Sequence, residues 1–321
     1  MKLGVLTVPL YSKPAEEAFE YLSSLGVQTL EIGVGGSPGN KHLNPAEYLD
    51  NPSKIKEYQA LVKKYNLTVS AFSVHGNGVH PNKAIAEKDH SEFVQACKLA
   101  QQFGVDRVVT FSGCPGDFPG AKYPNWVTCA WPTDFSDILK YQWDEVLIPY
   151  WRETAKVANS YGIYKVAFEM HPGFCVYNPK TLLRIREAVG ETIGANFDPS
   201  HLFWQGINPS DAIRYLKGAI YHFHAKDTLI IPANVRVNGV LETSSYTDYI
   251  SRGWYFRTVG YGHDELLWKD IISTLMAIGY DDAISIEHED GLMSVTEGLE
   301  KAIDFLKHVM IFDELPEAWW V

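Results

Sequence analysis

The chain has 321 residues, of which 46% are hydrophobic and 21% are charged, and these values are typical of a folded globular protein rather than a disordered or fibrous one. The length suits one barrel-sized domain better than two large domains. With 28 Lys and Arg residues against 39 Asp and Glu residues, the net charge is −11, which opposes binding to nucleic-acid phosphates. We therefore expect a single domain that has no nucleic-acid partner.

The sequence shows no sign of export or of a membrane anchor. Pro9, Ser12 and charged residues interrupt the N-terminal apolar run before it reaches the length of a signal-peptide core, and no apolar run approaches membrane-spanning length. The cysteines lack a CxxC pair and fit reduced thiols in the cytosol; they are Cys97, Cys114, Cys129 and Cys175. We expect a cytoplasmic protein without a membrane partner.

Short apolar runs alternate with amphipathic stretches along the whole chain, as parallel βα units require. In chain order, the predicted strands are Leu3–Val8, Thr29–Gly33, Thr68–Val74, Arg107–Phe111, Lys165–Glu169, Gly194–Asp198, Ile220–Ala225 and Ala283–Glu287. The predicted helices are Pro14–Leu25, Lys54–Tyr65, His90–Phe103, Tyr141–Tyr161, Pro179–Val189, Pro209–Leu216, Glu265–Ile278 and Ser294–Met310. Asn178-Pro179 and Asn208-Pro209 are typical of helix starts, because Asn caps the first turn and Pro fits its first position.

Eight such units predict an α/β fold, a single-domain (β/α)8 TIM barrel over residues 1–310. An open doubly wound sheet would usually carry a Gly-rich turn after its first strand, where this chain has Val8-Pro9-Leu10-Tyr11. The connections from Ser112 to about Leu139, after strand four, and from Asp227 to Asp264, after strand seven, are too long for plain βα loops. Both are rich in aromatic residues, and we expect them to roof the catalytic end of the barrel.

Residues 311–321 follow the last predicted helix and end in Ala318-Trp319-Trp320-Val321. Such an apolar end is costly to expose to water. We expect this tail to pack on a partner subunit, in a homo-oligomer or a hetero-complex, or else on its own barrel.

Four side chains that commonly bind metals stand at the ends of successive predicted strands five to eight. They are Glu169 in VAFEMHP, Asp198 in GANFDPSH, His224 in YHFHAKD and Glu287 in ISIEHED. Because side chains alternate along a strand, each shares its face with the residue two positions earlier, and that face points into the barrel. Three carboxylates at one spot would repel each other, and a divalent cation would relieve the repulsion. The oxygen-rich set with one nitrogen favours Mn²⁺, with Mg²⁺, Co²⁺ and Zn²⁺ as alternatives.

The strand-end motifs E-x-H-P, N-F-D-P-S-H, H-x-K-D and S-I-E-H-E, together with EIGVGG and GNGVHP, resemble the sugar phosphate isomerase/epimerase family of the xylose isomerase-like TIM barrel superfamily. The resemblance covers nearly the whole chain. It implies that the family's metal ligands fall on Glu169, Asp198, His224 and Glu287, the residues chosen above. In the family's ketose 3-epimerases the two Glu ligands also exchange the substrate proton, so the resemblance implies catalytic roles for Glu169 and Glu287.

Three histidines near the strand ends are candidate substrate-binding residues. His201 resembles the family's D-x-x-H histidine that steadies a substrate oxygen; otherwise it is a helix-start or loop residue. His75 ends strand three on the same side of the barrel, where substrate hydroxyls would lie. His171, two residues after Glu169, either binds substrate or is an ordinary loop residue.

Lys226 and Arg257 are the cationic candidates for substrate binding. Lys226 either holds an oxyanion or phosphate, or makes an ion pair with its neighbour Asp227. Ketose 3-epimerases carry a G-E-x-x-R type of run after the His ligand, where this chain has Ala225-Lys226-Asp227-Thr228. Arg257, in the second long loop, replaces that Arg if it reaches back over the mouth, and is otherwise a solvated loop residue.

The leading functional hypothesis is a metal-dependent isomerase or epimerase, with a small carbohydrate as substrate, that transfers a proton next to a carbonyl through an enediolate. A second hypothesis is a lyase that uses the same proton abstraction at C2 of a 3-keto glycoside, attached through carbon or oxygen, to expel the C1 group; it suits the large aromatic loops. An endonuclease would need a basic groove, which the net charge opposes. A non-enzymatic reading is a metal-binding, sugar-binding or scaffold subunit of a complex.

Overall fold

Eight parallel strands form the closed barrel that the sequence predicts. The computed structural model of the chain describes residues 1–313 and 320. The barrel strands are β1 (Lys2–Leu6), β2 (Thr29–Gly36), β3 (Thr68–His75), β4 (Arg107–Thr110), β5 (Lys165–Glu169), β6 (Ile193–Phe197), β7 (Ile220–Ala225) and β10 (Ala283–Ile286). β1 closes the ring by pairing with both β2 and β10. Each predicted strand matches one of these to within three residues at either end.

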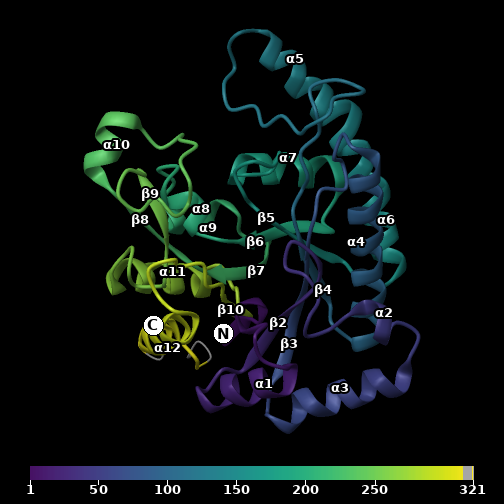
Figure 1. Cartoon of the computed structure of the whole chain (residues 1–321), viewed down its shortest axis with the longest axis vertical. Coiled ribbons are helices and arrows are strands. Elements are labelled where there is room, and N and C mark those ends of the chain that lie inside the picture. The colour runs from purple at the N-terminus through teal and green to yellow at the C-terminus, as the bar shows by residue number, and fades with distance from the viewer. Residues whose placement is uncertain (314–319, 321) are drawn as a thin grey trace.

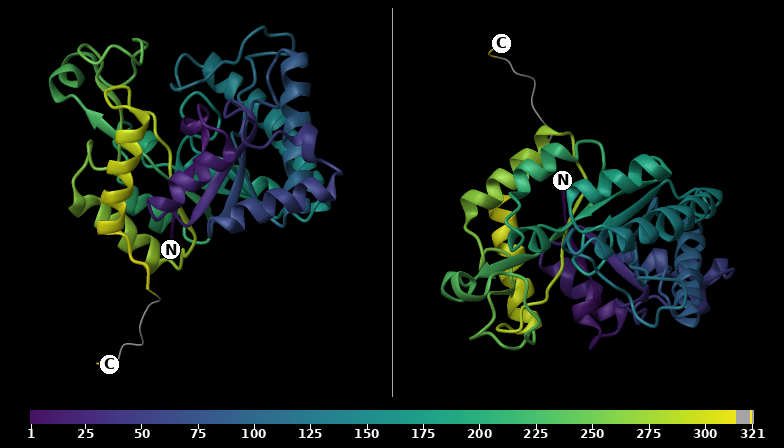
Figure 2. Two further views of the ribbon diagram at one scale, coloured as in Figure 1. Left: turned by 60° about the horizontal axis from the view of Figure 1, so that its bottom comes forward. Right: turned by 90° about the horizontal axis from the view of Figure 1, so that it is seen from above.

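Helices surround the strands, as Figure 1 and the two views of Figure 2 show. Those that match predicted helices are α1 (Ala15–Ser24), α3 (Pro52–Lys64), α4 (Lys83–Phe103), α6 (Ile148–Ser160), α7 (Pro179–Val189), α9 (Pro209–Tyr215), α11 (Glu265–Ala277) and α12 (Val295–Val309). Asn178 and Asn208 cap α7 and α9 as predicted, since their side chains accept hydrogen bonds from Thr181 N and Asp211 N.

Two helix starts differ from the prediction. α4 begins at Lys83 rather than at His90, because the Asn82 side chain accepts a hydrogen bond from Ala84 N and caps the helix earlier. The helix predicted over Tyr141–Tyr161 begins with a π-helical segment, η2 (Tyr141–Leu147), that continues directly from α5 (Asp134–Lys140). The remaining short helices are η1 (Val8–Leu10), α2 (Pro45–Tyr48), α8 (Ser200–Phe203) and α10 (Pro232–Asn238).

The apolar core lies mainly between the strands and the helices, where, for example, the rings of Trp151 and Phe168 pack 4.4 Å apart. Inside the barrel the apolar cluster is small and consists of Ala71, Val109 and Ala167. The barrel strands are therefore buried on both faces, as parallel barrels require. The small interior cluster leaves room for polar side chains at the carboxyl ends of the strands.

The two long connections lie at the carboxyl ends of β4 and β7, which places both at the same end of the barrel. In Figure 1, α5 of the first connection and α10 of the second lie at opposite sides of the upper part of the molecule. The second connection contains an antiparallel hairpin that the sequence analysis missed, formed by β8 (Asp227–Ile230) and β9 (Trp254–Arg257). Asp227 anchors it, because its carboxylate accepts hydrogen bonds from Gly260 N, Gly262 N and His263 N at 3.0 to 3.1 Å.

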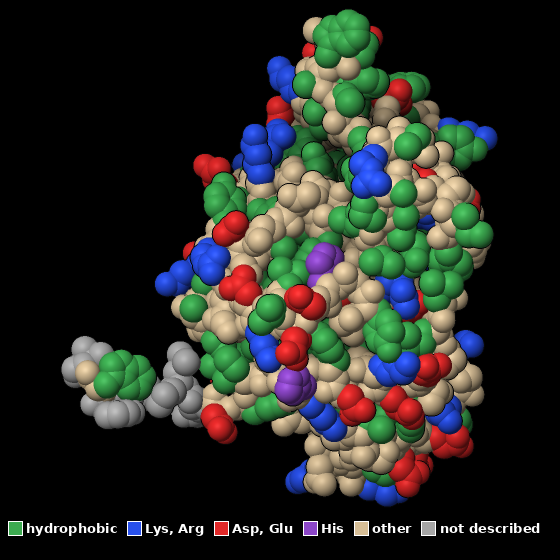
Figure 3. All heavy atoms as spheres, turned by 90° about the vertical axis from the view of Figure 1, so that its left-hand side faces the viewer, with side chains coloured by type: hydrophobic (Ala, Val, Ile, Leu, Met, Phe, Trp, Pro, Cys, Tyr) green, Lys and Arg blue, Asp and Glu red, His purple; other side chains and the backbone are tan. Residues whose placement is uncertain are grey.

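The surface in Figure 3 shows Lys and Arg side chains scattered among Asp and Glu side chains, without a continuous basic patch on that face. None of the helices within residues 1–313 combines the length and the apolar character that a membrane crossing needs. The predicted tail contact falls mostly outside the described residues, because 314–319 and 321 are not described.

Candidate metal centre and active site

The structure brings together the four side chains predicted from the strand ends. Glu169 ends β5, Asp198 follows β6, His224 lies near the end of β7 and Glu287 follows β10. One donor atom from each lies within 4.8 Å of the others, and we call these residues the four-donor cluster. Glu169, Asp198 and His224 are buried, and the Glu287 side chain is 15% exposed. The cluster is thus reached from the carboxyl end of the barrel.

His224 is oriented by a carboxylate that the sequence analysis did not select. Its Nε2 lies 2.9 Å from both carboxylate oxygens of Glu31, on β2, so this nitrogen donates its hydrogen to Glu31. Ser285 Oγ also donates to Glu31, at 2.6 Å, and so does Ser73. A carboxylate behind a histidine fixes the ring and leaves its other nitrogen for a metal. His224 Nδ1 therefore faces Glu169 and Glu287, at 3.5 and 3.3 Å.

The donors of the cluster fit a divalent cation. His224 Nδ1 and Asp198 Oδ2 are both buried and make no hydrogen bond with the described residues, although Asp198 Oδ2 lies 3.2 Å from the Lys226 ammonium. Buried polar atoms without a hydrogen bond are costly. A metal ion would satisfy both of them. Three carboxylates and one imidazole match the ligand preferences of Mn²⁺, Mg²⁺, Co²⁺ or Zn²⁺.

Lys226 lies beside the cluster and supplies a positive charge. Its Nζ lies 3.2 Å from Asp198, 2.6 Å from Glu287 and 3.0 Å from Glu289, and its side chain is 2% exposed. The alternative that Lys226 pairs with Asp227 is wrong, because Lys226 pairs with Asp198, Glu287 and Glu289. Asp227 instead faces the backbone of the long loop.

These charges change the ionisation of the carboxylates. Burial raises the pKa of Asp198 to about 7, against the opposing effect of Lys226. Burial would also raise the pKa of Glu287, but Lys226 and His224 outweigh it and lower that pKa to about 2. Without a metal, therefore, Asp198 is the carboxylate of the cluster that takes up a proton near neutral pH, whereas Glu287 stays ionised.

Two of the predicted substrate-binding histidines hold the Glu169 carboxylate. His75 Nε2 lies 2.9 Å from Oε2 of Glu169, and His201 Nε2 lies 2.9 Å from Oε1. Burial lowers the pKa of His201 to about 3, so its ring is neutral and donates one hydrogen. The ring of His171 lies 4.0 Å from that of His201. The structure thus brings all three histidines to the four-donor cluster.

The structure does not bring Arg257 to the cluster. Its Nε donates a hydrogen bond to Oδ2 of Asp290 at 2.9 Å, and its guanidinium lies over the ring of Tyr261. Arg257 stands opposite Asp227 in the β8–β9 hairpin. Its position fits a role in holding the long loop to the segment after β10.

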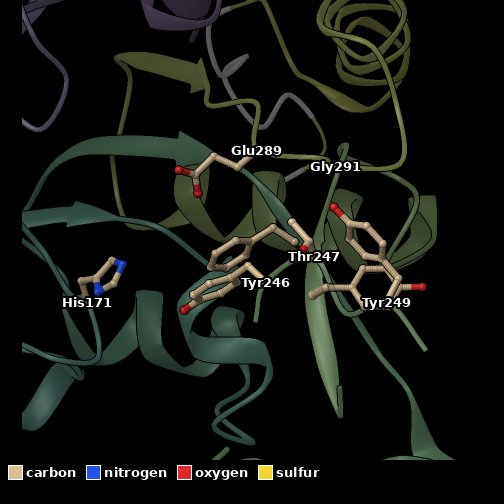
Figure 4. A pocket seen from close by; sticks show the side chains of 8 residues that line it. His171, Tyr246, Thr247, Tyr249, Glu289 and Gly291 are labelled. Atoms are coloured by element: carbon tan, nitrogen blue, oxygen red, sulfur yellow. The ribbon is translucent and has the colours of Figure 1, made fainter. Parts of the chain in front are cut away.

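One cavity opens beside the cluster, and a second cavity adjoins the first. The first, of about 170 Å³, is lined among others by Glu169, Glu287 and Lys226, and we call it the inner cavity. The second, of about 370 Å³, is lined mainly by aromatic residues of the second long loop, and we call it the outer pocket (Figure 4). His171 and Glu289 line both cavities.

Among the described residues, the second long loop alone contributes Tyr and Phe side chains to the outer pocket, so the expectation that both aromatic loops roof the catalytic end is met for this loop only. In the first loop Trp126 packs against Tyr177 instead, with ring centroids 5.4 Å apart. Sequence reasoning also missed Glu31 and Glu289. The available signals were a single acidic residue between Leu30 and Ile32 in an apolar strand, and a second acidic residue two positions after Glu287.

Comparisons with known proteins agree with this fold. The model of the family described as xylose isomerase-like TIM barrel matches residues 19–309. YfiH, an uncharacterized protein of Bacillus subtilis strain 168, is 39% identical over 313 residues, which cover 97% of this chain and 99% of YfiH.

Two solved structures share the barrel at low identity. D-psicose 3-epimerase of Clostridium cellulolyticum H10, solved with D-tagatose, is 15% identical with a TM-score of 0.61, covering 97% of this chain and 100% of its own. The IOLI protein, solved with a zinc atom, is 19% identical with a TM-score of 0.65, covering 96% of each chain.

Proposed function

Because the chain belongs to the xylose isomerase-like TIM barrel family, we propose that it is a divalent-metal-dependent sugar isomerase or epimerase. The observation that carries the proposal is the four-donor cluster beside a cavity, with two glutamates that reach the same spot from β5 and from the end of β10. The epimerase named among the structural neighbours agrees with this class of substrate.

The proposed reaction is a proton transfer on the carbon next to a carbonyl. A divalent cation in the cluster, for which Mn²⁺ is our first candidate, supplies Lewis acidity toward the substrate carbonyl and the neighbouring hydroxyl. Glu169 and Glu287 take and return the proton, passing through an enediolate of the substrate. His75 and His201 fix the two oxygens of Glu169, so this carboxylate is pre-oriented. Lys226 keeps Glu287 ionised, as a base requires.

The test is deuterium incorporation from D₂O into a panel of aldoses, ketoses and 3-keto glycosides, with protein loaded with Mn²⁺ and with protein stripped by EDTA. We expect incorporation at a carbon next to the carbonyl of at least one free sugar, lost on stripping and restored by metal. Metal binding without exchange on any member of the panel would reject the proposal and favour a binding or scaffold role.

A lyase is the second candidate, and the outer pocket is the observation that favours it. The aromatic lining extends the site beyond the 170 Å³ inner cavity, which gives room for the group that a glycoside carries at C1. The two candidates share proton abstraction but differ in their product. Release of the C1 group from a 3-keto glycoside, without exchange on free ketoses, identifies the lyase.

A further inference from the structure

The inner cavity and the outer pocket adjoin each other. His171 and Glu289 belong to the lining of both, and in Figure 4 the Tyr246 ring lies between His171 and Tyr249. The outer pocket, at about 370 Å³, is roughly twice the size of the inner cavity. A ligand that placed its reacting carbon beside Glu169 and filled only the inner cavity would leave most of the site empty.

The outer pocket is built to contact flat rings. Tyr246 and Phe256 lie nearly parallel, at 12° with centroids 5.8 Å apart, and Tyr249 meets Tyr255 edge to face at 5.4 Å. Tyr and Phe rings bind the apolar faces of other rings and lose few rotamers in doing so. The lining therefore favours a ring over an extended polar chain.

The key ring is held in place before any ligand binds. The guanidinium of Arg252 lies 4.4 Å from the ring centroid of Tyr246, and the Arg252 side chain is buried. Arg252 Nε donates to Trp254 O at 3.0 Å, so its own position is fixed by the hairpin. On the cluster side, Lys226 Nζ lies 4.7 Å from the ring of Phe256. Such pre-organisation lowers the entropy cost of binding.

The charges around the outer pocket disfavour an anionic substituent. Among the described residues its lining contains no Lys or Arg, and its one carboxylate belongs to Glu289. Lys226 is already paired with Asp198, Glu287 and Glu289, and Arg252 is buried behind Tyr246. A phosphate here would lie near a carboxylate without a free cation to bind it.

We infer that the substrate is a sugar that carries a neutral ring as a substituent, and that the outer pocket binds this ring against Tyr246 and Phe256. The inference rests on the proposed function, because it places the sugar's reacting carbon beside Glu169 and Glu287. The ring is either an aromatic aglycone or a second sugar, since both offer an apolar face. Sugar phosphates are therefore excluded as the preferred substrate class.

The test measures affinity by calorimetry on the full chain loaded with Mn²⁺. The probes are free hexoses, their phenyl glycosides, disaccharides with the same reducing or non-reducing hexose, and the hexose 6-phosphates. We expect at least one phenyl glycoside or disaccharide to bind about tenfold tighter than its parent hexose, and the hexose phosphates to bind no tighter than that hexose. If the phenyl glycoside binds more tightly than the disaccharide, the ring is an aromatic aglycone. If the disaccharide binds more tightly, the ring is a second sugar.

Variants of Tyr246 test whether the outer pocket causes the difference in affinity between ring probes and hexoses. Tyr246→Ala should reduce the ratio of ring-probe affinity to hexose affinity to nearly one, whereas Tyr246→Phe should keep it. Tyr164→Ala is the matched control, because Tyr164 is 63% exposed, against 55% for Tyr246, and lies just before β5 at the opposite end of the barrel. An unchanged ratio in Tyr246→Ala, or tighter binding of a hexose phosphate, overturns the inference.

The outcomes also separate this inference from the proposed function. Deuterium exchange on free sugars without any advantage of a ring probe would leave the isomerase proposal standing and reject the ring assignment. A ring advantage that depends on Tyr246, in a protein that exchanges no proton with any metal, would support the ring assignment and reject the proposed function.

Discussion

His224 and Glu31 form a buried pair in which His224 Nε2 lies 2.9 Å from both carboxylate oxygens. Burial would raise the pKa of Glu31, but His224 and His222 outweigh it and hold this pKa well below its usual range. Glu31 is therefore an anion behind the one nitrogen ligand of the cluster. An anion in this position makes the histidine a stronger ligand and fixes which nitrogen faces the metal.

We expect Glu31→Gln to bind Mn²⁺ roughly 10- to 100-fold more weakly than the wild type. The amide keeps the shape of the side chain but removes the negative charge behind His224. Titration calorimetry on stripped protein measures the affinity directly. Glu191→Gln is the control, because the Glu191 side chain is 93% exposed and far from the cluster in the fold; equal metal affinities in the two variants would contradict the role of Glu31.

Glu169→Gln and Glu287→Gln should each reduce deuterium exchange by at least about 100-fold, because each removes one of the two proposed proton carriers. His224→Ala should instead act mainly through loss of metal. Measuring exchange at a metal concentration that saturates each variant separates the two effects. Full exchange activity in both Gln variants would reject the proton-transfer roles.

Metal affinity should rise with pH. Asp198 must lose its proton to bind a cation, and burial raises its pKa to about 7. Burial would lower the pKa of His224, but Glu31 and Glu287 hold it well above its usual value, so Nδ1 must lose a proton as well. The logarithm of the affinity should then climb by about two per pH unit below pH 7, where both groups are protonated, and less steeply above it, where Asp198 is ionised.

Calorimetry in buffers of different ionisation enthalpy, between pH 5.5 and 8.5, measures the number of protons released on binding. The expected count is about two at the acidic end, and it falls toward the alkaline end as Asp198 ionises. Binding of Mn²⁺ without proton release across this range would contradict the ionisation states derived for the cluster.

The sequence predicted the barrel and the four-donor cluster for one geometric reason. In a parallel barrel the carboxyl ends of all strands meet at one end, so strand-end residues such as Glu169 and Asp198 converge whatever the details of packing. The alternation along β7 likewise places His222 and His224 on the inner face, where His222 hydrogen-bonds to Asn196. These relationships follow from the two-residue alternation of side chains along a strand and from the order of the strands in the barrel.

The remaining parts of the site depend on tertiary contacts that no local pattern contains. Glu31 reaches His224 across the barrel interior, from a strand 193 residues away in the chain. The outer pocket depends on how the β8–β9 hairpin folds within a long insertion. The pairing of Arg257 with Asp290 depends on the same hairpin, which places Arg257 next to the segment after β10. Loop conformation is set by such contacts rather than by the composition of the loop.

Lys226 provides the last prediction, because it takes over part of a metal's role in the metal-free chain. Its ammonium group neutralises carboxylates that would otherwise repel each other, and its side chain is 2% exposed. Removing one partner of a buried ion pair typically costs about 3–5 kcal/mol of stability. Metal-free Lys226→Met should therefore unfold at clearly lower denaturant concentration than the wild type. Mn²⁺ should raise the stability of this variant more than it raises the stability of the wild type.

Lys165→Met is the control, since Lys165 pairs with Asp106 at the surface with a side chain that is 41% exposed, and such pairs contribute about 0–1 kcal/mol. If the two variants lost equal stability without metal, Lys226 would not be the counter-charge of the cluster.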